Sequence, residues 1–190
     1  LRSSLEQYEF ANRLLAHGIS VMPPVYADAS LQLVLYCQGA RPLSQLWQEG
    51  NRMAFHHTEL FADELQRTHQ QDIVIGDRWG PNELVLPDGK HLFVDFDIEI
   101  WGPEAREFEF ASLLYFTSYF AQQGEANNID DVRASYSKIL GRAKKFGIYN
   151  VPTLHRYLLR YPEYFAEEGK YHWKDRKAGI HFFRELISDA

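Results

Sequence analysis

Two short segments of the chain carry oxygen-bearing side chains at a spacing suited to metal and phosphate chemistry. Asp77 and Asn82 lie in the run GDRWGPN at residues 76–82, and Asp95 follows in the run DFD at residues 95–97. Carboxylate and amide oxygens are ligands of the kind that Mg²⁺ takes, and this ion is held by one or two carboxylates together with substrate phosphates. The three side chains therefore suit a Mg²⁺ ion bound together with a phosphate-bearing substrate.

A tight β-hairpin is expected to bring Asn82 and Asp95 close together. Residues 83–86 and 91–96 are strand-forming runs, and the sequence Pro-Asp-Gly-Lys at 87–90 between them is a strong turn signal. Asn82 precedes the first strand and Asp95 ends the second. Antiparallel pairing therefore places these two residues at the same end of the hairpin.

The remaining elements are expected to be mainly helical. The predicted helices are 3–17, 43–71 with a break at Gly50, 104–122, 129–146, 151–160 and 175–188. A short apolar strand is predicted at 31–36, and the β-branched run at 72–76 is expected to lie buried ahead of Asp77. This order of elements predicts an α+β fold with a helical C-terminal half.

Composition places the chain among globular proteins and excludes some classes of partner. It has 190 residues, 45% hydrophobic and 24% charged, which suits one domain or two small lobes with a shared core. Its net charge of −6 and its pI of about 5.7 argue against bulk attraction to nucleic acid or to anionic membranes. The single cysteine, with no long apolar run and no signal-like start, predicts a cytoplasmic protein.

Taken as a set, these motifs resemble those of the protein-kinase-like fold, most closely its aminoglycoside/choline phosphotransferase-like branch. The pattern D-x-x-x-x-N, a hairpin and D-F-x occupies residues 77–97, and HQQDIVIGD at 69–77 is similar to the branch's LHxxGIxHGD run. The run DFD with a later Gly102-Pro103 resembles the segment DFD…GP, and Glu-Phe-Ala at 109–111 stands where the branch usually has DLA. The resemblance covers roughly residues 5–120, in the correct order.

The resemblance implies a role for each residue of the central motif. Asp77 would be catalytic, orienting or deprotonating the acceptor hydroxyl, and Asn82 would hold metal from the catalytic loop. Asp95 would bind the Mg²⁺ that bridges the phosphates of ATP. Taken one at a time, Asp77, Asn82 and Asp95 could also be ordinary turn residues, because Asp and Asn are favoured in turns by local hydrogen bonding.

The resemblance also implies nucleotide-binding residues nearer the N-terminus. The helix that contains Glu9 is similar to the helix whose glutamate pairs with the ATP-binding lysine. Leu35, Tyr36 and Cys37 resemble the strand and hinge whose backbone contacts adenine. On this basis residues 1–40 are expected to be the remnant of a truncated N-terminal lobe, and residues 41–190 a helical C-terminal lobe with the catalytic and metal loops.

Three departures from the branch are visible in the sequence. No glycine-rich loop and no lysine precede Glu9, and the first lysine of the chain is Lys90. Ile75 replaces the histidine that usually precedes Gly-Asp, and Arg78-Trp79 replaces smaller or apolar residues. Phosphoryl transfer in this fold depends on a lysine and a loop over the phosphates, so either upstream strands supply them in the native protein or the module is degenerate.

Three functional hypotheses follow. The first is an ATP- and Mg²⁺-dependent phosphotransferase acting on a hydroxyl, with a small-molecule acceptor favoured over a protein. The second is a pseudokinase-type binding or regulatory module that contacts a protein partner. The third is an unrelated hydrolase that uses Asp77 and Asp95 as metal ligands for the attack of water.

Other polar and aromatic residues are expected to be structural. Adjacent His56 and His57 point about 100° apart on a helix and cannot share one ion. His69 is expected to support the loop that follows it, and Cys37 has no basic neighbour that would make it a nucleophile. The C-terminal aromatic residues are expected mostly to pack helices together, with some left as candidates for an acceptor pocket.

Overall fold

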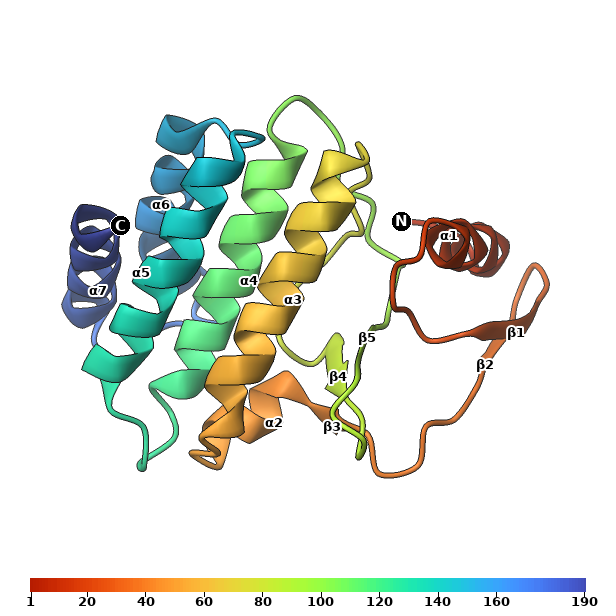
Figure 1. Cartoon of the computed structure of the whole chain (residues 1–190), viewed down its shortest axis with the longest axis horizontal. Coiled ribbons are helices and arrows are strands. Elements are labelled where there is room, and N and C mark those ends of the chain that lie inside the picture. The colour runs from red at the N-terminus through yellow and green to blue at the C-terminus, as the bar shows by residue number, and fades with distance from the viewer.

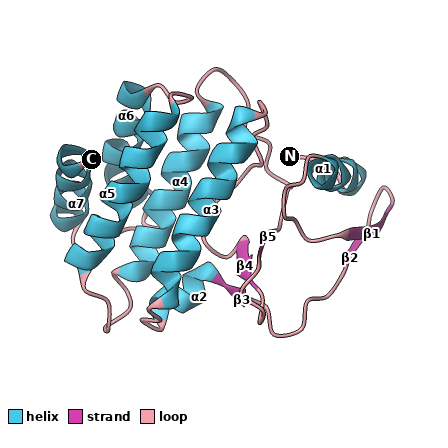
Figure 2. Ribbon diagram, viewed as in Figure 1, coloured by secondary structure: helices cyan, strands magenta, loops and turns pink.

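The computed structural model describes all 190 residues of the chain as seven helices and five short strands. The helices are α1 (Ser4–Ala16), α2 (Leu43–Gln48), α3 (Met53–Gln70), α4 (Ala105–Ala121), α5 (Ile129–Phe146), α6 (Val151–Glu168) and α7 (Arg176–Asp189). The strands are β1 (Pro24–Ala27), β2 (Gln32–Val34), β3 (Arg41–Pro42), β4 (Glu83–Val85) and β5 (His91–Phe93). The predicted α+β class with a mostly helical C-terminal half is confirmed, and Figure 2 shows how little of the chain is strand.

A bundle of helices α3 to α7 makes up one side of the molecule (Figure 1). Helix α4 is its centre, since it contacts α2, α3, α5 and α6 and is buried along almost its whole length. Beyond the charged residues near its start its side chains are mostly apolar on all sides, which suits such a central position. None of the helices is both long enough and apolar enough to cross a membrane.

The predicted hairpin is confirmed and forms part of a small antiparallel sheet in the order β3-β4-β5. Glu83 pairs with Phe93 at its open end, and the backbone N–H of Val94 donates to the carbonyl of Asn82 at 3.0 Å. The chain at Val21 also pairs in parallel with Phe93. This sheet therefore fixes Asn82 close to the segment that leads into Asp95.

The N-terminal part lies on the other side of the hairpin from the bundle (Figure 1). Helix α1 begins with a capping box, in which Ser3 and Glu6 bond each other's backbone N–H groups, and it contacts the antiparallel pair β1-β2. Phe10 and Leu14 of α1 belong to the same cluster of buried side chains as the bundle. The hydrophobic core thus continues across the lobe boundary predicted at residue 40.

The structure differs from the sequence-based expectations in several elements, among them strands β1 and β3, which the sequence does not predict. Helix α6 does not end before Pro162, as predicted from the proline, but continues to Glu168 with Pro162 inside it. The cost of a proline in a helix is offset here because α6 packs against both α4 and α7 through residues such as Leu158 and Tyr161. The run at 72–76 is buried at Ile73 and Ile75, as expected, yet it forms no strand.

Candidate functional site

The loop between α3 and β4 carries Asp77 and Asn82. Asp77 is half-buried, whereas Asn82 is almost fully buried, and the side-chain N–H of Asn82 donates to the carbonyl of Asp77 at 3.0 Å. This bond fixes the two predicted catalytic residues relative to each other. It engages the amide nitrogen of Asn82 and leaves the amide oxygen for a cation.

Asp95 lies where β5 ends, in a backbone conformation that few residues adopt. Its φ of 58° is in the left-handed region, which is uncommon for residues other than glycine. Although the carboxyl reaches solvent, partial desolvation and the neighbouring Asp97 carboxyl raise the pKa of Asp95. Strained backbone concentrates at functional sites, and a bound cation would relieve the repulsion between the two carboxylates.

Arg78 joins the loop to both strands at the open end of the hairpin from a fully buried position. Its guanidinium donates to the carbonyl oxygens of Val94 at 3.3 Å, Asp95 at 3.1 Å and Asn82 at 3.5 Å. The same group lies over the ring of Phe93 at 5.2 Å. A single side chain therefore holds the segment of Asn82 against the segment of Asp95.

Two buried acidic side chains face Arg78 and shape the loop around Asp77. Glu83 lies 3.4 Å and Glu109 3.8 Å from the guanidinium. Glu109 accepts the backbone N–H groups of Ile75 at 3.1 Å and Gly76 at 2.7 Å, and Glu83 accepts that of Gly80 at 2.6 Å. Backbone donors that would otherwise be unpaired in the core are satisfied by these carboxylates.

His69 completes this network. Its ring nitrogens contact the Glu109 carboxylate and the Tyr149 hydroxyl, each at 2.8 Å, and the ring is fully buried. The expectation that His69 supports the loop is confirmed. Because Glu109 also holds the backbone immediately before Asp77, the network runs without a break from α3 through α4 to the loop.

Burial also sets the protonation of Glu83, because it raises the pKa of this carboxyl to about 7, with Arg78 acting in the opposite direction. At pH values between the ordinary pKa of an unfolded glutamate and about 7, folded Glu83 keeps a proton that the unfolded chain has released. The unfolded state then binds fewer protons, so the free energy of unfolding falls as the pH rises through this window.

This linkage can be measured by urea unfolding of the wild-type chain and of a Glu83→Gln variant, from about pH 5 to about pH 8 with EDTA present. The wild type is expected to lose about 2–3 kcal/mol more stability than the variant over this range. The contributions of other titrating groups cancel in the comparison, because both proteins contain them. Parallel pH profiles would show that Glu83 has no raised pKa.

An apolar cavity of about 320 Å³ adjoins Asp95. It is lined from two directions, with Val34 on the N-terminal hairpin and Leu84 and Val94 on the β4-β5 hairpin. Helix α1 contributes Gln7 to the lining of the cavity. This mostly apolar cavity thus lies directly beside the carboxyl expected to bind metal.

None of the four residues predicted to bind nucleotide lines this cavity. Glu9 is exposed on α1 and lines a shallow polar pocket with arginines rather than facing a lysine. Leu35 and Tyr36 follow β2 with exposed side chains, and the thiol of Cys37 lies 3.5 Å from the sulfur of Met22. The structure brings none of these four side chains into the cavity beside Asp95.

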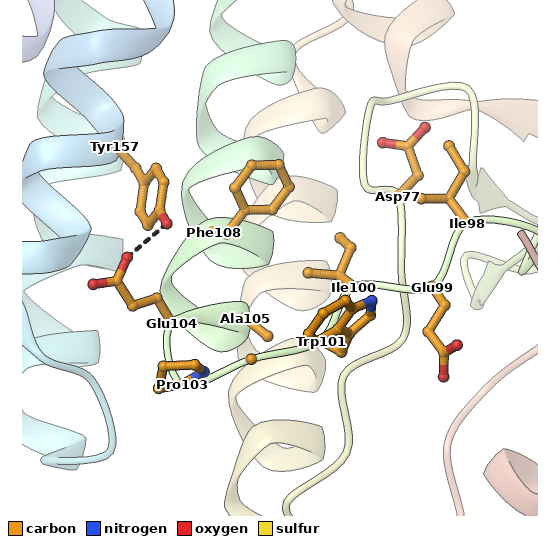
Figure 3. A pocket seen from close by; sticks show the side chains of 11 residues that line it. Asp77, Ile98, Glu99, Ile100, Trp101, Pro103, Glu104, Ala105, Phe108 and Tyr157 are labelled. Carbon is orange, nitrogen blue, oxygen red and sulfur yellow. Dashed lines mark hydrogen bonds between the residues drawn. The ribbon is translucent and has the colours of Figure 1, made fainter.

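A second cavity, of about 580 Å³, has Asp77 in its lining (Figure 3). Its walls include Ile98 and Trp101 of the loop after Asp95, and Phe108 of α4. In Figure 3 Asp77 and Glu104 lie at opposite ends of the view, and Glu104 accepts a hydrogen bond from the Tyr157 hydroxyl at 2.8 Å. Asp77 is therefore accessible to a molecule bound in this cavity.

The protein side chains alone do not make up a complete metal site. No group of three or more His, Cys, Asp or Glu side chains is arranged to hold a metal ion. Asn82 and Asp95 offer one amide and one carboxylate, with Asp97 beside them, which suits Mg²⁺ when phosphates complete its coordination.

The sequence predicts Asp77, Asn82 and Asp95 as site residues, and these assignments stay predictions. It gives Glu83 only as the start of a strand and Arg78 only as a departure from a pattern, and their supporting contacts are visible in the structure alone. No local signal in the sequence identifies the role of Arg78, because its loop at residues 76–82 contains other polar residues, Asp77 and Asn82. In comparisons with known proteins, no protein-family model and no curated protein sequence matches the chain.

Proposed function

We propose that the chain carries the catalytic and metal loops of an ATP- and Mg²⁺-dependent phosphotransferase of the kinase-like fold, acting on a hydroxyl group. The observation that supports this most is the arrangement around Arg78. This one buried side chain fixes the loop of Asp77 and Asn82 against the segment of Asp95. Phosphoryl transfer depends mainly on positioning and electrostatics, so such a rigid frame is what the reaction requires.

In this proposal each of the three residues has one task. The amide oxygen of Asn82 and the carboxylate of Asp95 hold Mg²⁺, which when bound neutralises the phosphates of ATP and orients them. Asp77 accepts the proton of the acceptor hydroxyl. Burial raises the pKa of Asp77, and this makes the carboxylate a better base than an exposed aspartate.

The apolar cavity beside Asp95 is the proposed site of the adenine ring. Val34 and Leu84 line it, and Val94 leads from it directly to Asp95. A planar base bound there would place its phosphates towards the metal-binding residues. Leu35, Tyr36 and Cys37 are then proposed to contribute through their backbone at the rim, not through their side chains.

A binding or regulatory module without catalysis is the second candidate, and one observation favours it. The first lysine of the chain, Lys90, lies in the turn of the hairpin with its ammonium 2.8 Å from Asp88. That lysine is mostly exposed and does not line the cavity beside Asp95. A module of this kind would bind nucleotide without transferring phosphate.

Calorimetric titration with Mg²⁺-ATP tests the proposed site. The wild-type chain is expected to bind Mg²⁺-ATP, and an Asp95→Ala variant is expected to lose at least tenfold in affinity, since the metal loses its carboxylate ligand. Asp88→Ala is the matched control, because Asp88 is an exposed aspartate in the turn of the same hairpin. Equal affinity of the wild type and the Asp95→Ala variant would contradict the metal assignment.

A further inference from the structure

A third cavity, of about 360 Å³, reaches Asp77 from the bundle and is almost entirely aromatic. Trp79 forms one wall, two residues after Asp77 in the loop. The other principal walls come from α4, α6 and the segment before α7, and they are Phe108, Phe116, Tyr164 and Tyr171. Asp77 and Phe108 also line the larger cavity of Figure 3, so the two spaces meet at Asp77.

The walls of this aromatic pocket are held in place by contacts with one another and with the helices behind them. Trp79 packs edge-on against Tyr171, with ring centroids 5.3 Å apart, and against Phe116 at 6.4 Å. Tyr171 has a φ of 51°, and its carbonyl accepts a hydrogen bond from the Tyr115 hydroxyl at 2.9 Å. The pocket is therefore formed before any ligand binds, as small-molecule sites usually are.

The pocket offers no charge other than that of Asp77. Its two inner hydroxyl groups, those of Ser112 and Tyr161, bond each other at 3.0 Å. In the adjoining larger cavity the two glutamates already have partners. Glu104 is paired with Arg156 at 2.5 Å, and Glu99 lies 3.7 Å from Arg2. A ligand carrying several positive charges would find no unpaired carboxylate for them apart from Asp77.

We propose that the acceptor is an uncharged alcohol that carries a ring, with the ring in the aromatic pocket and the hydroxyl beside Asp77. Aromatic side chains bind such rings by edge-to-face and offset contacts, with gain from the apolar area removed from water. The binding part of this proposal stands on the pocket alone. The transfer part rests on the proposed phosphotransferase function.

The transfer step would proceed as follows. The acceptor oxygen forms a bond to the γ-phosphorus of ATP while the bond from that phosphorus to the β–γ bridging oxygen breaks. ADP leaves with the electron pair of the broken bond, and the hydroxyl proton passes to Asp77. The products are ADP and the phosphate monoester of the alcohol.

Binding can be tested by calorimetric titration without ATP, using 2-phenylethanol as the probe. Saturable binding is expected, with at least a fivefold loss of affinity in a Tyr164→Ala variant. Tyr164 is 49% exposed at the mouth of the pocket, so its replacement does not endanger folding. Trp101→Ala is the control, because Trp101 is 84% exposed and lines only the larger cavity of the two. Absence of saturable binding, or equal losses in the two variants, would overturn the proposal.

The charge of the ligand is tested with a matched pair of alcohols. Choline and 3,3-dimethyl-1-butanol have nearly the same shape, but only choline carries a positive charge. The neutral alcohol is expected to bind at least as tightly as choline. Tighter binding of choline would show that the aromatic rings form a cation site, and the proposal of a neutral acceptor would be wrong.

Binding and transfer fail separately in these experiments. If 2-phenylethanol binds in the pocket but receives no phosphate from Mg²⁺-ATP, the pocket assignment holds and the proposed phosphotransferase function fails. If phosphate is transferred only to charged alcohols, the function holds and the assignment of a neutral acceptor fails.

Discussion

Replacement of Asp77 by asparagine is expected to slow phosphoryl transfer by about 10²- to 10⁴-fold, the usual contribution of a general base. Binding of Mg²⁺-ATP is expected to stay nearly unchanged, because Asp77 does not contact the proposed metal ligands through its carboxylate. The backbone carbonyl of Asp77, which accepts the Asn82 amide, is retained in the variant. The loss should therefore appear in kcat and not in nucleotide affinity.

Transfer of labelled phosphate from ATP to an alcohol, followed at saturating nucleotide, measures this effect. Asp63→Asn is the control, since Asp63 is a half-exposed aspartate of α3 that pairs with Arg142. Burial raises the pKa of Asp77, with Asp97 and Asp95 adding to the effect and Arg78 opposing it. Wild-type activity should consequently fall as the pH drops through this raised pKa. An Asp77→Asn variant with wild-type kcat would exclude Asp77 as the base.

Replacement of Arg78 by methionine is expected to destabilise the chain by about 3–5 kcal/mol. Removing one partner of a buried ion pair leaves the other charge without compensation, and costs of this size are typical. Here Glu83 and Glu109 would both lose their cation, and the carbonyl groups of Val94 and Asp95 would lose a donor. Because Arg78 also holds the backbone of Asp95, this residue should lose its fixed position in the variant.

Urea unfolding at neutral pH measures this loss. Arg176→Met serves as the control, because Arg176 is half-exposed and 3.8 Å from Glu163, a surface pair of the kind that contributes about 0–1 kcal/mol. A double variant, Arg78→Met with Glu83→Gln, should recover part of the stability since one uncompensated carboxylate is removed. If Arg78→Met costs no more than Arg176→Met, Arg78 does not support the loop.

The hairpin and the proximity of Asn82 to Asp95 could be predicted because both depend on local sequence. A turn signal between two strand-forming runs determines the pairing, and the register follows from the turn. The capped start of α1 is local in the same sense. Local sequence is not sufficient for helix α6. Its packing against other helices stabilises the helix beyond Pro162, where the proline alone predicts its end.

The buried network was not predictable, because its partners are far apart in the chain. Arg78 and Glu109 meet only after α4 has packed beside the loop, and His69 reaches Tyr149 across the bundle. A single sequence carries no signal for such pairings. The aromatic pocket was not predictable either, because aromatic side chains that pack helices and those that line a pocket have the same spacing along a helix.

The most direct test of the account is a crystal structure of the chain with Mn²⁺ and a non-hydrolysable ATP analogue. Manganese replaces magnesium at oxygen sites and is located by its anomalous scattering. An anomalous peak is expected in contact with the amide oxygen of Asn82 and the carboxylate of Asp95, with the adenine between Val34 and Leu84. Nucleotide bound elsewhere, or no metal at Asn82 and Asp95, would contradict it.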